Sequence, residues 1–498
     1  MFARALLMIA SKIVAHAAFM LIAVVLARSL AQAEFGTFNQ VWLFNKALLF
    51  LFDLGLPMSV YYFWPRLADR QKKGFILQTL FSLALLAVPF AATMYFLADS
   101  VSVQFNNPDL AGHLRLFALY PLVMLPASAT EELLLSQGLT GRAAAFESFT
   151  KIAMIAAVAA AALLSHRLDW VLRALIGYGT LQLILGIWLV WQPVRHLKAR
   201  WSVGDWTSQL AYSAPYGFST LAAVANYQVD KVLVSLFNAP AAFAVYAAGA
   251  FEIPIAGVTA VPVVSVMMGD LTRHFAAGNI DEFLALWHRS MRKVALPVFA
   301  VTAFLMVFAE PTVTLLFSAK YASSVGPFRF FLLFLPLRIT VLDYILASLG
   351  KTKAVFAAQL AATATNILLG AFLIRAVGWW GAALSAVLSG YIQSGLLANE
   401  IRKQLGIGAV RLMPWLDLVK VGWVAIAAAV ACLPVLWLPV GGVWQLAVGG
   451  CIYTTIYGVG SLKVGAITMA EIQGLLRWGR NKLKAVWTRG DRQDRLRP

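Results

Sequence analysis

Charged residues are scarce in this chain of 498 residues. They make up 12% of it, whereas about 25% is usual in soluble proteins. Hydrophobic residues make up 61%, and the mean hydropathy is +0.77. Apolar stretches of the roughly 20 residues that a helix needs to cross a bilayer recur from end to end. This composition excludes a soluble enzyme, a secreted disulfide scaffold and a disordered protein, and it predicts an all-α polytopic membrane protein.

Cysteine and catalytic motifs are equally scarce. The two cysteines, Cys432 and Cys451, lie in apolar stretches without metal-ligand spacing, so we expect both to be small buried apolar residues. The six histidines form no H-E-x-x-H motif, and no G-x-S-x-G or D-x-D motif occurs. We therefore predict no catalytic residue, no metal site and no cofactor, and we leave open a coupling ion, H+ or Na+.

A search for apolar stretches of spanning length predicts about 14 transmembrane helices. The first has no convincing cleavage site and is expected to be retained. The predicted spans cover residues 6–27, 38–62, 76–98, 114–137, 146–165, 170–192, 210–236, 243–268, 292–310, 327–349, 354–375, 379–400, 418–438 and 443–463.

The distribution of basic residues predicts the orientation. With an even number of spans, both termini lie on the same side of the membrane. If that side is the cytoplasm, 29 of the 40 Lys and Arg residues belong to inner segments and seven to outer ones. Cytoplasmic loops carry such an excess, so we predict cytoplasmic termini. Membrane topology thus explains the net charge of +18, and nucleic acid is not expected as a partner.

The two halves of the chain resemble each other at an offset of roughly 205–215 residues, as in many transporters. Six spans separate the repeats, so both halves have the same orientation in the membrane. We expect two six-helix lobes around a central cavity, with two extra C-terminal helices. The predicted parts are 1–200 (N-lobe, spans 1–6), 201–405 (C-lobe, spans 7–12), 406–465 (spans 13 and 14) and 466–498 (basic cytoplasmic tail). The echoes are AEFGTFNQ with AAFAVYAA, LPMSV with VPVVSV, LRLFALYPL with FRFFLLFLPL, SQGLT with SLGKT, and Gly177-Tyr178 with Gly390-Tyr391.

Ionisable residues inside the spans are the candidate functional residues, because charge at membrane depth is costly and usually faces a cavity or a partner. Glu131 and Glu132 in the fourth span belong to this set. The basic members have no acid one helical turn away in their own spans, so a bound anion is one counter-charge and an ion pair that fixes helix packing is the other. The predicted cavity residues are Lys12, Lys46, Asp53, Asp230, Lys231, Glu252, Arg338 and Asp343.

Several segments resemble the bacterial polysaccharide transporters of the Wzx type, in the multidrug/oligosaccharidyl-lipid/polysaccharide (MOP) exporter superfamily. The resemblance covers roughly residues 8–400. Its segments are SKIVAHAAFMLIAVVLARSLAQAEFGTFNQ, GLPMSVYYFWPR, YQVDKVLVSLFNAPAAFAVYAAGAFEIPI and LASLGKTKAVFAAQLAATATNILLGAFLIRAVGWWGAALSAVLSGY.

The resemblance implies a MATE-like fold and a flippase that works by alternating access in the bacterial inner membrane. The substrate would be an undecaprenyl-diphosphate-linked oligosaccharide for exopolysaccharide or O-antigen assembly. A polysaccharide polymerase and export machinery would be partners beside the lipid bilayer. The resemblance also implies a partly cationic lumen, with Lys12 and Lys46 in the first two spans, and it matches Asp230 to an acidic residue of the seventh span.

Three other functions compete with a flippase. A drug/cation antiporter of the same fold would favour an acidic, aromatic pocket, whereas four basic residues lie within these spans. A membrane polymerase, ligase or glycosyltransferase of the same pathway would need a sizeable external loop or carboxylates at the membrane face. A scaffold that transports nothing would leave the buried charge unexplained.

Overall fold

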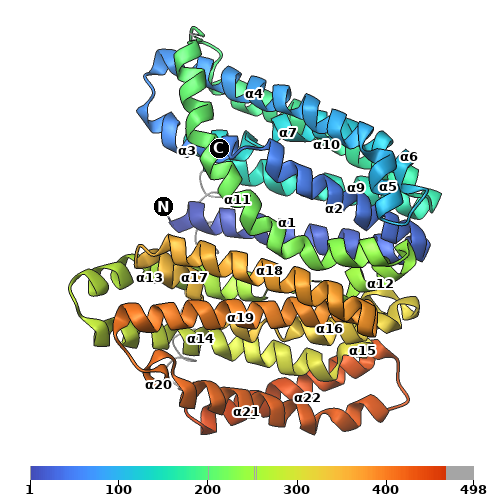
Figure 1. Ribbon diagram of the computed structural model, residues 1–498, viewed down its shortest axis with the longest axis vertical. Coiled ribbons are helices and arrows are strands. Elements are labelled where there is room, and N and C mark those ends of the chain that lie inside the picture. The colour runs from blue at the N-terminus through green and yellow to red at the C-terminus, as the bar shows by residue number, and fades with distance from the viewer. Residues whose placement is uncertain (1, 200, 252, 254, 467–498) are drawn as a thin grey trace, which may run out of the picture. The chain divides into compact units, whose positions relative to one another are not determined.

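The computed structural model describes residues 2–199, 201–251, 253 and 255–466, and every regular element in that part of the chain is a helix (Figure 1). Helices are the natural outcome of long apolar segments in a bilayer, because each helix satisfies its own backbone hydrogen bonds where no water is available. The expected all-α architecture is confirmed.

The first half of the chain forms twelve α-helices and two short 3-10 helices. They are α1 (Phe2–Ser29), α2 (Gln32–Phe52), α3 (Leu56–Phe63), η1 (Trp64–Arg66), α4 (Asp69–Phe96), α5 (Ala98–Gln104), α6 (Leu110–Phe117), α7 (Leu119–Ala127), α8 (Thr130–Ser136), α9 (Thr140–Ser165), α10 (Leu168–Trp191), η2 (Gln192–Val194), α11 (Val203–Phe237) and α12 (Pro240–Gly249).

The second half continues in the same manner. Its elements are α13 (Ile255–Ala276), α14 (Ile280–Val307), α15 (Ala309–Phe317), η3 (Ala319–Ser324), α16 (Val325–Leu332), η4 (Pro336–Ile339), α17 (Leu342–Ser348), α18 (Thr352–Val377), α19 (Trp380–Leu405), α20 (Ala409–Leu412), α21 (Trp415–Ala431), η5 (Leu433–Trp437) and α22 (Gly442–Lys463).

Within the described residues, nine helical segments are long and apolar enough to cross a membrane. A tenth candidate is the pair Leu110–Phe117 and Leu119–Ser136, which is bent by 42°. Each of the fourteen predicted spans overlaps one or more helices, so that count is compatible with the structure. The predicted basic tail, 466–498, lies outside the described residues apart from its first residue.

The chain packs into two compact units. The first unit comprises Met1–Glu252, Val313–Phe331 and Phe356–Gln393, and the second comprises Ile253–Thr312, Leu332–Val355 and Ser394–Pro498. Each unit collects segments from both halves of the sequence, so this division by packing differs from the predicted lobes, which stay a prediction.

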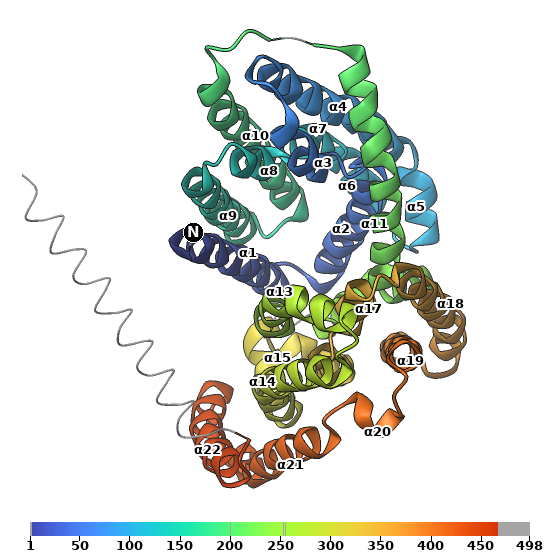
Figure 2. The ribbon, with the colours of Figure 1, turned by 90° about the vertical axis from the view of Figure 1, so that its left-hand side faces the viewer.

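In the first unit, α1 packs along α9 and α9 along α10 (Figure 2). Helix α2 packs against both α11 and α12. The contact between α2 and α12 depends on Gly36. A Cβ atom at this position would lie 1.9 Å from the backbone oxygen of Pro240. Small residues at such a position let two helix backbones approach closely.

Buried side-chain amides join the helices of the first unit. Gln209 on α11 donates to Ser59 on α3 at 3.0 Å and to Thr79 on α4 at 2.9 Å, and it accepts from Gln78 at 3.0 Å. All four side chains are buried. Because a buried amide is costly unless it is hydrogen-bonded, this network specifies how α3, α4 and α11 pack together.

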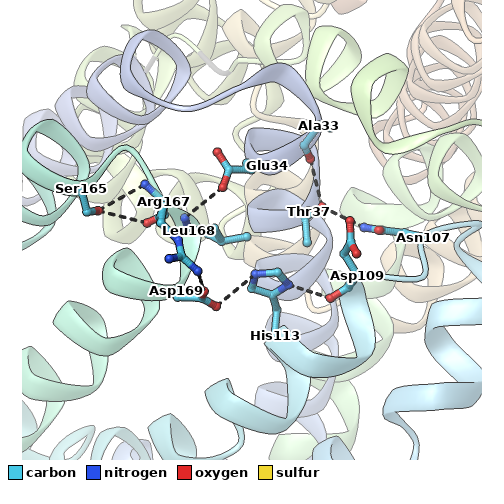
Figure 3. A network of polar contacts seen from close by, with 10 residues as sticks. All are labelled: Ala33, Glu34, Thr37, Asn107, Asp109, His113, Ser165, Arg167, Leu168 and Asp169. Carbon is cyan, nitrogen blue, oxygen red and sulfur yellow. Dashed lines mark hydrogen bonds and ion pairs between the residues drawn. The ribbon is translucent and has the colours of Figure 1, made fainter.

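A second polar network joins the ends of α2, α6 and α10 (Figure 3). The Glu34 carboxylate accepts the backbone N–H of Leu168 at 3.3 Å. His113 Nε2 lies 3.4 Å from Asp169, which also accepts from Arg167 at 3.1 Å. These contacts satisfy polar groups where the helices begin, so this end of the first unit is held by side chains as well as by apolar packing.

In the second unit, α21 and α22 pack against α14 around a core that includes Phe308, Tyr453 and Tyr457. Tyr453 and Tyr457 stack with their ring centroids 5.7 Å apart. Cys432 is buried in the same core, as expected, but Cys451 is exposed. Cys451 points away because it lies two residues before Tyr453 on α22, and positions two apart on a helix face different sides.

Candidate functional site

The clearest ionic cluster in the first unit surrounds Lys12 on α1. Its Nζ lies 2.8 Å from the carboxylate of Glu131 on α8 and 2.9 Å from Glu147 Oε1 on α9. The neighbouring Ser11 donates to the other oxygen of Glu147, Oε2, at 2.9 Å. Two consecutive residues of α1 therefore bind both oxygens of one carboxylate on α9.

Burial differs sharply across this cluster. The side chain of Glu147 is 8% exposed, that of Glu131 is 23% exposed, and that of Lys12 is 49% exposed. Glu147 thus depends on Ser11 and Lys12 for compensation, since a buried carboxylate without partners is strongly destabilising. Glu131 lies in the first turn of α8, where the helix dipole favours negative charge.

A second ammonium group lies one helical turn from Glu147. Lys151 donates to the hydroxyl of Tyr178 on α10 at 3.3 Å. Its Nζ also lies 5.6 Å from the centre of the Phe19 ring, a distance that permits a cation–π interaction. Lys151 extends the polar region from α1 and α8 to the contact between α9 and α10.

Carboxylates outnumber ammonium groups in this cluster. Glu132, next to Glu131, interacts electrostatically with Glu131, Lys12 and Asp53. Its Oε2 atom is buried and has no hydrogen-bond partner among the described residues. The three glutamates therefore outnumber Lys12 and Lys151, and this part of the first unit is acidic on balance. The partly cationic lumen that the resemblance implies stays a prediction.

The counter-charges of Lys12 come from other helices. The sequence leaves open a bound anion and an ion pair, and the structure places Glu131 and Glu147 beside Lys12. Whether Lys12 also faces substrate stays a prediction. Its side chain as a whole is half-exposed.

Two other predicted cavity residues lie within α2 and at its C-terminal end, in different surroundings. Lys46 is half-buried within α2, and Asp53 caps the C-terminal end of the same helix. The chain then turns through Leu54 and Gly55, which have φ values of 48° and 68°. This turn brings Asp53 within electrostatic reach of Glu132, so Asp53 belongs to the edge of the Lys12 cluster.

Asp230 and Lys231 lie on α11. Asp230 is 4% exposed and accepts a hydrogen bond of 2.7 Å from the hydroxyl of Tyr246 on α12. The adjacent Lys231 acts on it electrostatically. Asp230 thus joins α11 to α12, a contact that could not be located from the sequence pattern alone.

Arg338 and Asp343 belong to the second unit. They lie on either side of Val341, which has a φ of 46° where η4 ends and α17 begins. They interact electrostatically across this kink, and Asp343 is exposed. Glu252 lies outside the described residues.

Glu147, Lys151 and Tyr178 are not among the residues predicted from the sequence. Glu147 and Lys151 stand at the start of the predicted span 146–165, where charges are usually taken as part of the adjoining loop. The signal that could have found them is their spacing of four, which puts an acid and a base on one helix face. Among the described residues, no group of three His, Cys, Asp or Glu side chains is arranged to hold a metal ion.

The family of this chain is shown by a match to a known family model. A family model described as "Polysaccharide biosynthesis protein" matches residues 2–268, which is more than half of the chain. The chain belongs to this family. The match covers α1 to α12 and most of α13, so it includes the whole Lys12 cluster. The family relationship inferred from the sequence is confirmed, and the protein is a multi-pass membrane protein.

Solved structures share the fold of this polysaccharide biosynthesis family member. The lipid II flippase MurJ, in an inward closed conformation, is 15% identical with a TM-score of 0.71, over 93% of this chain and 98% of that one. An inward-facing multidrug resistance MATE family transporter of the MOP superfamily is 14% identical with a TM-score of 0.66, over 78% and 94%. None of the curated proteins compared with the chain matches it. The MATE-like fold is therefore confirmed.

Proposed function

We propose that this protein is a flippase that moves an undecaprenyl-diphosphate-linked oligosaccharide from the inner to the outer leaflet of the bacterial inner membrane. The product would serve exopolysaccharide or O-antigen assembly. The observation that carries the proposal is the combination of membership in the polysaccharide biosynthesis family with a fold shared over 93% of the chain with a lipid II flippase.

The physical chemistry of such a substrate fits a membrane unit with internal charge. A diphosphate and a glycan cannot cross hydrocarbon without compensating cations and hydrogen-bonding groups. The first unit holds Lys12 and Lys151 beside three glutamates. Ammonium groups suit the diphosphate and carboxylates accept hydrogen bonds from sugar hydroxyls, while the lipid tail stays in the bilayer.

The protein would work by alternating access, with both termini in the cytoplasm. Fold relatives in inward-facing and outward-facing conformations support this mechanism. Glu132 is a candidate for proton coupling, because it combines a buried carboxylate oxygen with a neighbouring acid. The coupling ion, H+ or Na+, is left open, and a polysaccharide polymerase and export machinery are the proposed partners.

A second candidate function is a drug/cation antiporter. The observation that favours it is the excess of carboxylates over ammonium groups around Lys12. An acidic cluster suits a cationic substrate better than an anionic one. The two functions therefore differ in the charge of the molecule that they carry.

Reconstitution into vesicles tests both candidates. A lipid-linked oligosaccharide with a fluorescent sugar is placed in the membrane, and a quencher that cannot cross the bilayer reports the fraction in the outer leaflet. A flippase should make the inner-leaflet pool accessible within minutes, and protein-free vesicles should not. Transport of cationic dyes without movement of the lipid-linked saccharide would replace the flippase proposal with the antiporter.

A further inference from the structure

A pocket of about 370 Å³ opens in the first unit between α3 and the first turns of α11. Its lining includes Gly55, Ser59, Tyr61 and Tyr212. The two helices pack side by side (Figure 1). This volume is near the lower end of the range of about 300–1,000 Å³ for small-molecule pockets, so it fits one sugar ring with its phosphate rather than a whole oligosaccharide.

Three planar groups are stacked at this pocket. The rings of Tyr62 on α3 and Tyr212 on α11 lie 4.3 Å apart at an angle of 19°. The guanidinium of Arg66 lies over the ring of Tyr62, with its Cζ atom 3.9 Å from the ring centre. Arg66 also donates to the backbone oxygen of Tyr62. The stack therefore orients the guanidinium before any ligand arrives.

Arg66 keeps most of its hydrogen-bonding capacity. A guanidinium has five N–H donors, and one contact with the Tyr62 carbonyl uses a single nitrogen. No carboxylate among the described residues lies within ion-pair distance of Arg66, which is exposed. A planar, oriented guanidinium without an acidic partner is suited to a phosphate group.

The floor of the pocket is polar and rigid. Ser59 is 1% exposed, donates to the backbone oxygen of Leu56 and accepts from Gln209 at 3.0 Å. At the break between α2 and α3, Gly217 of α11 lies so near Leu54 that a Cβ atom on Gly217 would come within 2.5 Å of the Leu54 backbone. The pocket therefore lies between helices that are held in place.

An aromatic belt at the membrane interface is the simpler explanation for exposed tyrosines. Belt side chains point outward into the headgroup layer and need no cavity beside them. Here Tyr61 and Tyr212 line a concavity, are 43% and 45% exposed, and adjoin an oriented guanidinium. These features together favour a binding site over a belt.

The predicted topology places this pocket at the cytoplasmic side, where a substrate from the inner leaflet would first bind. Tyr61 and Tyr62 end the predicted span 38–62, and Tyr212 begins the span 210–236, both at the predicted cytoplasmic side. Lys72 and Lys73 follow at the start of α4. Such a basic helix start attracts anionic headgroups to the same surface.

We propose that this pocket, named here the tyrosine–arginine pocket (Tyr61, Tyr62, Arg66 and Tyr212), binds the phosphate and adjoining sugar of a lipid-linked saccharide before transport. Arg66 binds the phosphate oxygens, and the exposed rings of Tyr61 and Tyr212 contact the sugar. The inference rests on the proposed flippase function and adds a loading site to it.

Binding measurements on purified protein in nanodiscs test this site. The probe is a short-chain polyprenyl diphosphate carrying one labelled sugar, and the variants are Arg66→Ala, Arg66→Lys and Tyr212→Leu. Arg70→Ala is the matched control, because Arg70 is exposed at the start of α4 and does not line the pocket. Arg66→Ala should weaken binding about 10- to 100-fold, the usual effect of losing hydrogen bonds to a charged group. Arg66→Lys should keep part of the affinity, Tyr212→Leu should weaken binding of the sugar-bearing probe more than of the sugar-free one, and Arg70→Ala should bind as the unaltered protein does.

The same phosphate chemistry could come from bulk anionic phospholipid instead of the substrate. Nanodiscs of zwitterionic lipid and of anionic lipid separate these sources. Competition by anionic phospholipid that abolishes the difference between Arg66→Ala and Arg70→Ala would assign the site to the bulk lipid and overturn the inference. Equal probe affinity of Arg66→Ala and Arg70→Ala in zwitterionic discs would overturn it too, while flipping by the unaltered protein would still support the proposed function. Failure of the unaltered protein to flip any lipid-linked saccharide would instead remove the proposed function itself.

Discussion

Replacing Lys12 with alanine removes the ammonium group that lies 2.8 Å from Glu131 and 2.9 Å from Glu147. Among the described residues, Glu147 then keeps the hydrogen bond from Ser11 and its electrostatic interaction with Lys151, although its side chain is 8% exposed. We expect the variant to be less stable because the buried carboxylate loses the ammonium group that is paired with it, even if Lys12 also serves transport.

The magnitude follows from the uneven burial of the pair. Exposed ion pairs contribute about 0–1 kcal/mol, and breaking a fully buried pair costs roughly 3–5 kcal/mol. Lys12 is 49% exposed and Glu147 is buried, so an intermediate loss on the order of 2 kcal/mol in the free energy of unfolding is expected. Per kcal/mol, the melting temperature of a domain of about 150–250 residues shifts by about 2–4 °C, and a longer chain should shift by less.

The assay compares single and double variants in detergent by thermal unfolding, together with the amount of protein in the membrane. Lys12→Ala should melt earlier and be less abundant. Adding Glu147→Gln to Lys12→Ala should recover most of the loss, because a neutral amide has no charge to compensate. Lys12→Arg should stay near the unaltered protein, since the charge remains.

Two results would contradict this reasoning. If Lys12→Ala melts like the unaltered protein, the contacts with Glu131 and Glu147 do not stabilise the fold. If Glu147→Gln lowers the melting temperature of Lys12→Ala further, the carboxylate is stabilised by something other than Lys12. Loss of flipping by a Lys12→Ala protein of normal stability would assign Lys12 to the substrate path alone.

Three further predictions concern packing and topology. Gly36→Ala should lower the melting temperature because its Cβ atom would meet the α12 backbone at 1.9 Å, whereas Gly177→Ala, with open space around it within α10, should raise stability by about 0.5–1 kcal/mol. Gln209→Leu should destabilise the protein by about 1–3 kcal/mol, because it leaves buried polar partners unsatisfied. Thermal unfolding of the Gly36→Ala and Gln209→Leu variants, compared with Gly177→Ala and the unaltered protein, checks these two predictions. Reporter fusions after Lys73 should give a cytoplasmic signal and fusions after Asp99 a periplasmic one; the reverse pattern would refute the predicted orientation.

Local apolar sequence was enough to predict most of the helices. The predicted span 76–98 corresponds to α4 (Asp69–Phe96), and 354–375 corresponds to α18 (Thr352–Val377). A spanning helix satisfies its backbone within itself, so hydropathy over about 20 residues carries nearly all the information needed. The family could be inferred for the same reason, because its segments are runs of such helices.

Breaks within the predicted spans could not be predicted from the apolar pattern. The predicted span 38–62 is divided into α2 and α3 at Leu54, and 327–349 is interrupted at Val341, both with positive φ. A non-glycine residue rarely adopts this conformation unless its surroundings impose it. Nothing in the apolar pattern marks such a position, whereas contact with neighbouring helices does.

The site shows the same division between local and tertiary information. That Lys12 is a costly charge within a span is evident from its place in the sequence. That Glu147 compensates it is not, because the two residues are 135 positions apart and meet only when α1 packs along α9. Likewise, Tyr62 and Tyr212 stack although they are 150 positions apart in the chain. Sequence determined which residues are chemically unusual for a membrane, and helix packing alone decided which of them meet, since partner choice depends on contacts between segments distant in the chain.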